Sequence, residues 1–239
     1  MSLDREMADR LGRVRERIAA ACRRAGRDPA EVTLVGASKQ QPLDRLAAAW
    51  RAGLRVFGEN RVQEAATKAP ALPLDCQWHL IGPLQSNKAR VAAGLFHVVH
   101  SVDRPKIAEA LAAEAEKLNR RLPCLLEINL GEEESKHGFL PEGLFEHLAF
   151  LGGLAALEIR GLMAIPPFGD VPEASRPWFV VLAQLRDRVA STGLLPDFRG
   201  ELSMGMSEDF EVAIEEGATH VRVGTALFGP RTPRLDGEV

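Results

Sequence analysis

The feature that most constrains the fold is a set of eight short apolar segments that alternate with helical segments along the 239 residues. The apolar segments are nearly continuous, which is typical of strands buried on both faces of a parallel sheet. They lie at residues 32–38, 55–60, 77–82, 97–103, 123–130, 157–165, 199–205 and 219–224. The pattern predicts an α/β fold, and eight units close a (β/α)8 barrel in one domain of this length. An open doubly wound sheet is compatible with the same pattern. We favour the barrel because no G-x-G-x-x-G motif follows the first strand.

A helix is predicted ahead of the first strand. Its apolar positions recur at helical spacing, and Gly26 provides a stop: Leu3, Met7, Leu11, Val14, Ile18 and Cys22. We therefore expect a single domain over residues 1–239, with an N-terminal helix at 3–26 and the barrel at 32–231.

Composition excludes several classes of protein. The 30 Lys and Arg nearly balance the 33 Asp and Glu, which argues against a nucleic-acid partner. No apolar stretch is long enough for a membrane span, and charges from Asp4 and Arg5 onward disfavour a signal peptide. Three widely spaced cysteines fit buried thiols in a reducing compartment. The sequence thus predicts a cytoplasmic protein without a membrane partner.

Lys39 is the sharpest candidate for chemistry, because it directly follows a buried apolar strand. Active sites of barrels lie at the carboxyl ends of the strands. Desolvation there lowers the pKa of a lysine, and the neutral amine forms Schiff bases with carbonyl compounds and with pyridoxal phosphate. The alternative is a strand-end lysine that reaches solvent.

The loops after the seventh and eighth strands predict a phosphate site. SMGMS (203–207) and RVGTALFG (222–229) combine glycines with hydroxyl groups. Barrels frequently bind phosphate at this position, where consecutive backbone N–H groups surround the anion. The alternative is a pair of ordinary turns in which Ser207 caps the following helix.

A metal site is not expected, because His79, His100 and His137 lie on different segments without paired ligand spacing. A Schiff-base aldolase without a cofactor is a second enzymatic alternative. It leaves the arginine that ends the eighth strand, Arg222, without a role.

Several segments resemble the YggS/PROSC family of single-domain pyridoxal-phosphate homeostasis proteins, which are similar to the N-terminal barrel of alanine racemase. They cover almost the whole chain in order: GASKQQP, FGENRVQE, WHLIGPLQSNK, HSVDR, INLGEEESKHGF, GLMAIPP and ELSMGMSEDFEVAIEEGATHVRVGTALFGPR. One departure is Gln40-Gln41, where many relatives have Thr-Lys. The resemblance implies a modified TIM barrel with an extra N-terminal helix.

The resemblance also implies the site residues. Lys39 holds pyridoxal 5'-phosphate as a covalent aldimine, and Arg222 faces the pyridine nitrogen. Ser203, Gly224 and Thr225 belong to the phosphate cradle, and Asn60, His79 and Met204 form the pocket wall. Lys136 is a second candidate acceptor of the aldehyde, with a solvated loop lysine as its alternative.

The function implied is storage, protection or delivery of pyridoxal phosphate without catalysis, with apo pyridoxal-phosphate enzymes as candidate partners. The alternative is an amino-acid racemase. Racemases that resemble this barrel use a tyrosine from a second domain as their second base. The chain has no tyrosine, and its length leaves no room for that domain.

Overall fold

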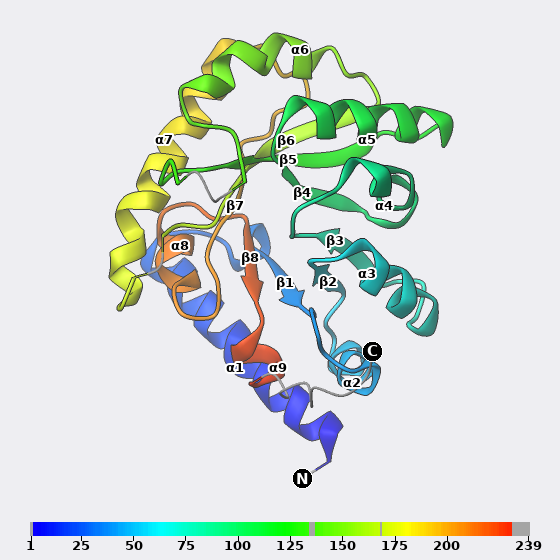
Figure 1. Ribbon diagram of the computed structural model, residues 1–239. Helices are drawn as coiled ribbons and strands as arrows, with labels where there is room; N and C mark the ends of the chain where they lie inside the picture. The colour runs from blue at the N-terminus through cyan, green and yellow to red at the C-terminus, as the bar shows by residue number, and fades with distance from the viewer. Residues whose placement is uncertain (1, 134–136, 168, 231–239) are drawn as a thin grey trace.

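The computed structural model describes residues 2–133, 137–167 and 169–230. Within them, eight parallel strands close a barrel in chain order, with β8 paired to β1 (Figure 1). The strands are β1 (Thr33–Ala37), β2 (Val56–Glu59), β3 (Gln77–Leu80), β4 (Val98–Val102), β5 (Leu122–Ile128), β6 (Leu157–Ala164), β7 (Glu201–Ser203) and β8 (His220–Val223). The closed barrel confirms the predicted fold class and excludes the open doubly wound sheet.

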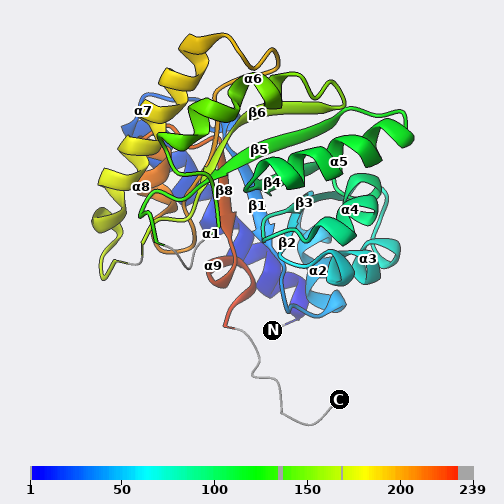
Figure 2. The same cartoon turned by 45° about the horizontal axis from the view of Figure 1, so that its top comes forward.

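After β1, helices cover the outside of the barrel, and all of them except α9, which follows β8, connect successive strands. They are α2 (Leu43–Arg51), α3 (Val62–Lys68), α4 (Ala89–Leu95), α5 (Pro105–Lys117), α6 (Leu148–Gly152), α7 (Arg176–Thr192), α8 (Phe210–Glu215) and α9 (Thr225–Phe228). Helices α3, α4 and α5 pack side by side along one flank (Figure 2). The carboxyl ends of β2, β3 and β4 therefore open into neighbouring loops.

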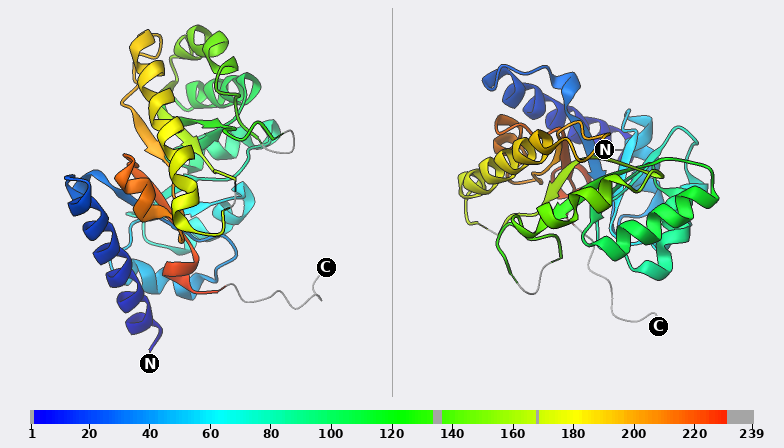
Figure 3. Two further views of the ribbon diagram at one scale, coloured as in Figure 1. Left: turned by 90° about the vertical axis from the view of Figure 1, so that its left-hand side faces the viewer. Right: turned by 90° about the horizontal axis from the view of Figure 1, so that it is seen from above.

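The predicted N-terminal helix is present as α1 (Leu3–Arg24). It lies along the outside of the barrel against α2, α8 and α9 (Figure 3). Its apolar stripe, which includes Met7, Leu11 and Val14, is buried in the main hydrophobic cluster between barrel and helices. This helix thus covers the flank where β8 meets β1.

The observed strands begin and end within a few residues of the predicted positions. Most strands are one or two residues shorter than predicted, and the helical segment after β5 begins as a 3-10 helix at Gly143–His147. Helix α9 was not predicted, because four residues carry no recognisable periodicity. The three cysteines are free and buried, as expected.

The inside of the barrel differs in character from the layer outside it. A small apolar cluster of Val35, Ala37 and Ile81 fills one part. Buried polar side chains on β3, β4, β7 and β8 fill another. No helix in the described part of the chain is long and apolar enough to cross a membrane.

Candidate functional site

The carboxyl ends of β8, β1 and β2 bring three of the predicted site residues together. Gly36 of β1 lies opposite Val223 of β8, and Ala37 lies opposite Gly58 of β2. Lys39 comes two residues after Ala37, Asn60 two residues after Gly58, and Gly224 directly after Val223, so the three lie at the same end of three adjacent strands. We call this end of the barrel the mouth.

A tight turn holds Lys39, which is half-buried. The Gln41 N–H donates to the Ser38 carbonyl at 3.0 Å, which closes a four-residue turn. The third residue of the turn, Gln40, has a φ of 59°, a left-handed conformation that is unfavourable for residues other than glycine. The Gln40 N–H donates to Glu64 Oε1 at 2.6 Å. Contacts outside the turn therefore stabilise its strained backbone.

A buried ion pair anchors the same turn from below. Lys68 Nζ of α3 donates to the Ser38 carbonyl at 2.8 Å, to Glu59 Oε1 at 2.8 Å and to Glu64 Oε1 at 2.7 Å. Glu59 is completely buried and accepts from Ser38 Oγ at 2.6 Å. Burial raises the pKa of Glu59, and hydrogen bonds from Lys68 and Ser38 oppose the rise. The sequence analysis missed this network, because Lys68 looks like an ordinary helical lysine.

Asn60 is half-buried and directly follows β2, the strand next to β1. Behind it, the backbone of Gly82 approaches so closely that a Cβ atom there would lie 2.6 Å from the Asn60 carbonyl oxygen. Any other residue at position 82 would displace Asn60. The glycine therefore helps to fix the position of Asn60 at the mouth.

The turn between β8 and α9 presents backbone N–H groups to a hydroxyl. Ser207 Oγ lies 3.2 Å from both the Gly224 and the Ala226 nitrogen and accepts a hydrogen bond from each. Ser207 does not cap the next helix, because α8 begins after Asp209. The interpretation of Ser207 as a helix cap was therefore wrong. Thr225 is exposed between the two donor residues.

Below the mouth, four buried polar side chains are joined by hydrogen bonds: His79, His100, Ser203 and Arg222. His79 Nδ1 lies 2.9 Å from His100 Nε2, and His100 Nδ1 lies 2.8 Å from Ser203 Oγ. Arg222 donates to Ser203 Oγ at 2.6 Å and to the Ala164 carbonyl at 2.9 Å. Burial lowers the pKa of both histidines well below its usual value, so they are neutral at pH 7.

Arg222 is almost fully buried, and burial lowers its pKa to about 10. It therefore stays protonated at neutral pH. An arginine has five N–H donors and no acceptor, and Ser203 and Ala164 take two of those donors. Donors remain for a further acceptor inside the barrel.

Ser203 and Met204 are the two predicted site residues at the end of β7, and both are fully buried. Ser203 is fully buried between His100 and Arg222, opposite His220 of β8, and the hydroxyl beside the backbone donors of the β8–α9 turn belongs to Ser207. Met204 is fully buried in the main hydrophobic cluster rather than at the mouth. Lys136 lies outside the described residues.

Glu127 of β5 is a further ionisable group that the sequence analysis missed. Burial and the nearby Asp103 raise its pKa to about 7, while Arg222 opposes the rise. Its Oε2 atom has no hydrogen-bond partner among the described residues. The sequence contains a hint of this role, because Glu127 lies within the apolar run LLEI. Side chains alternate along a strand, so Glu127 points to the face opposite that of the buried Leu126 and Ile128.

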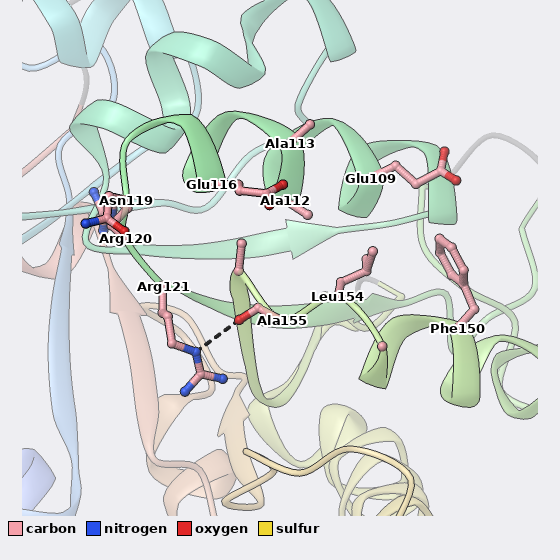
Figure 4. Close-up of a pocket in the computed structure, with 12 residues that line it drawn as sticks. Glu109, Ala112, Ala113, Glu116, Asn119, Arg120, Arg121, Phe150, Leu154 and Ala155 are labelled. Carbon is pink, nitrogen blue, oxygen red and sulfur yellow. Dashed lines mark hydrogen bonds between the residues drawn. The ribbon is translucent and has the colours of Figure 1, made fainter.

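Two further features of the described residues were compared with the mouth: groups of metal-ligating side chains and a cavity outside the barrel. Among the described residues, no group of three or more His, Cys, Asp or Glu side chains could hold a metal ion. A cavity of about 700 Å³ lies outside the barrel between α5 and the segment after α6 (Figure 4). Arg121 there donates to the Ala155 carbonyl at 3.0 Å, and alanines form much of the lining. None of the predicted site residues lines this cavity.

Comparisons with known proteins agree with the geometry. Residues 10–232 match the alanine racemase N-terminal domain family. The chain is 47% identical to the pyridoxal phosphate homeostasis protein of Aquifex aeolicus over 93% of this chain and 97% of that protein. It is 45% identical to that of Pseudomonas aeruginosa over 94% of this chain and 96% of that protein.

Solved structures show the same relationship. PipY of Synechococcus elongatus PCC7942 is 39% identical, with 93% of this chain and 100% of that chain covered. Its structures have TM-scores of 0.83 without PLP and 0.81 with PLP bound. Alanine racemase from Bartonella henselae shares only the fold, at 16% identity and a TM-score of 0.71, with 95% of this chain and 59% of that chain covered. The chain therefore belongs to the pyridoxal phosphate homeostasis protein family, built on the barrel of the alanine racemase N-terminal domain.

Proposed function

We propose that this protein binds pyridoxal phosphate at the mouth, with the cofactor attached through its aldehyde to the Lys39 amine, and keeps it in store for the cell. The observation that carries the proposal is the position of the Lys39 turn beside the β8–α9 turn. The two turns follow hydrogen-bonded strands, so an amine and a set of backbone N–H donors meet at one end of the barrel.

The residues present fit the phosphate group. The Gly224 and Ala226 N–H groups already converge on one oxygen atom, that of Ser207. A phosphate accepts hydrogen bonds from such donors, and convergent backbone N–H groups are a recurring anion site. Position 224 lacks a side chain that would cover them, and the Thr225 hydroxyl is exposed beside them.

Arg222 fits the ring nitrogen. When bound, pyridoxal phosphate supplies an electron sink whose strength depends on protonation of that nitrogen. Arg222 can only donate a hydrogen bond, so it keeps an acceptor nitrogen unprotonated. The Ser203 and Ala164 contacts hold the guanidinium in place. A weak sink favours storage of the cofactor over amino-acid chemistry.

We propose further that the protein does not turn over amino acids. Racemisation needs acid–base groups on both faces of the cofactor, and loss of one costs on the order of 10²–10⁴-fold. Lys39 supplies one group. The sequence contains no tyrosine to supply the other, and His79 and His100 are buried, neutral and bonded to each other.

Attachment is tested by the visible absorbance spectrum of the purified protein, borohydride reduction and peptide mapping. Wild type and the control Lys106→Ala, an exposed lysine on α5, should carry the pyridoxyl label on the peptide that contains Lys39. Lys39→Ala should lose most of the cofactor. Full loading of Lys39→Ala, with the label on Lys136, would refute the assignment.

The racemase alternative is tested by following the optical purity of L- and D-alanine and of a wider amino-acid panel. Turnover in the enzymatic range of about 1–10³ s⁻¹, abolished by Lys39→Ala, would establish a racemase.

Delivery is tested by mixing the loaded protein with an apo pyridoxal-phosphate enzyme and measuring the recovery of its activity. We expect faster recovery than with the same amount of cofactor released into buffer.

A further inference from the structure

Three successive helices on one flank of the barrel begin immediately after a cationic residue. Arg61 precedes α3, Lys88 precedes α4 and Arg104 precedes α5, and these helices pack side by side (Figure 2). All three residues line one cavity of about 730 Å³, together with Asn60 and His137. We call it the cationic cavity. Asn60 connects it to the mouth.

Helix stability does not explain these residue types. The position before a helix favours Ser, Thr, Asp or Asn, whose side chains accept from the first N–H groups. Arg61 and Arg104 have extended backbones at this position and make no capping hydrogen bond. Lys88 differs, because it is the last residue of the 3-10 helix Ser86–Lys88, which leads directly into α4. A positive charge at this end of a helix is also opposed by the helix dipole. Residues that lower the stability of their own helix without another stabilising contact are expected at functional sites.

The positive charge of the cavity is only partly neutralised. Arg104 donates to Asp103 Oδ2 at 2.5 Å, and His137 Nδ1 lies 3.4 Å from the same oxygen. Arg61 and Lys88 form no ion pair with any residue in the part of the chain that the structure describes. Two cations without an ion-pair partner among the described residues therefore line one cavity, together with the side chains of Gln63 and Gln85.

We propose that the cationic cavity is a second anion site, separate from the phosphate cradle at the β8–α9 turn, and that it takes the phosphate monoester of a small molecule. Guanidinium and ammonium groups are the side chains that bind phosphate oxygens most strongly. The volume lies within the range of small-molecule sites, which is larger than a bare ion requires. This site needs no cofactor at Lys39.

The test is calorimetric titration of the full chain with phenyl phosphate and with inorganic phosphate, at low salt because the site is open to solvent. The double variant Arg61→Gln/Lys88→Gln should weaken binding by about tenfold or more. The matched control Arg90→Gln/Lys106→Gln removes two exposed charges outside the cavity and should bind as wild type does. His137 lines the cavity, and its imidazole proton resonance should shift during the titration.

A further variant separates this proposal from the proposed function. Gly224→Val blocks the phosphate cradle at the mouth and should leave the His137 shift and the binding to the cavity intact. Phosphate binding that is lost in Gly224→Val but kept in Arg61→Gln/Lys88→Gln would overturn the second site and leave the first. An unshifted His137 resonance, or binding of an acidic peptide but not of phenyl phosphate, would also overturn it.

Thermal unfolding distinguishes a ligand role from a structural one. If Arg61 and Lys88 bind an anion at the expense of helix stability, Arg61→Gln/Lys88→Gln should unfold at the same temperature as wild type or higher when no phosphate is present. A lower unfolding temperature together with unchanged phosphate affinity would show that the two cations serve the fold.

Discussion

Removal of the charge of Lys68 tests what holds the Lys39 turn in place. Lys68→Met leaves the completely buried carboxylate of Glu59 without its cation and the Ser38 carbonyl without its donor. Loss of one partner of a buried ion pair costs about 3–5 kcal/mol. We therefore expect the free energy of unfolding to fall by that amount at pH 8. The cost is a large fraction of the roughly 5–15 kcal/mol that stabilises a typical protein.

The loss should depend on pH in a defined direction. Burial already raises the pKa of Glu59, and removal of Lys68 raises it further. A folded carboxyl with a raised pKa binds a proton at a pH where the unfolded carboxyl, with a pKa near its usual ~4.3, does not. Protonation then removes the buried charge, so stability increases as pH falls through this window. The difference between wild type and Lys68→Met should be smaller at pH 5 than at pH 8.

The assay is urea unfolding followed by circular dichroism at both pH values. Lys117→Met is the matched control, because Lys117 makes a 2.7 Å ion pair with Glu114 but is 67% exposed, and it should cost less than about 0.5 kcal/mol. The double variant Glu59→Gln/Lys68→Met should recover much of the loss, since no buried charge remains. A cost below about 1 kcal/mol for Lys68→Met, equal at both pH values, would refute the reasoning.

Three further predictions concern the mouth and the barrel interior. Thr225→Ala should weaken pyridoxal phosphate binding roughly 10- to 150-fold, as measured by absorbance titration, because a charge-assisted hydrogen bond contributes about 1.5–3 kcal/mol. Glu127→Gln should flatten the pH dependence of unfolding between pH 5 and 7. The pKa of Glu127 is raised to about 7, so wild-type stability falls by up to about 3 kcal/mol as pH rises through this range, and equal slopes for both proteins would contradict the assignment. Gln40→Gly should increase the free energy of unfolding by up to about 1 kcal/mol by relieving the positive φ, whereas Gln40→Ala should not.

The strands and the mouth could be predicted from the sequence because their signals are local. Each strand is a short apolar run next to a helical pattern, and the carboxyl ends of parallel strands meet at one end of a barrel. This pattern predicts that Lys39 and Gly224 lie at the same end of the barrel, and the resemblance adds Asn60 to them. The different surroundings of Ser203 and Ser207 could not be predicted, because both hydroxyls lie in the same short motif: Ser203 lies opposite His220 in the sheet, and Ser207 accepts from the Gly224 N–H.

The support of the Lys39 turn could not be predicted, because it depends on the direction of side chains in a different element. Glu59 ends β2 and points outward to α3, where Lys68 lies on the turn of helix that faces the barrel. In the sequence, Glu59 looks like a strand-end carboxylate at the mouth and Lys68 looks like a solvated helical lysine. Only their burial distinguishes them, and burial is a property of the packed helix layer rather than of either segment.

The same argument explains why a strained residue can persist next to Lys39. A left-handed Gln40 costs about 1–2 kcal/mol, and the turn contributes one hydrogen bond of its own, from the Gln41 N–H to the Ser38 carbonyl. Further stabilisation comes from Glu64 and Lys68 of α3, which bond to the two backbone groups on either side of Lys39. The position of the amine at the mouth is thus determined by a helix on the outer wall. Substitutions in α3 should therefore alter the affinity for pyridoxal phosphate without any contact with the cofactor.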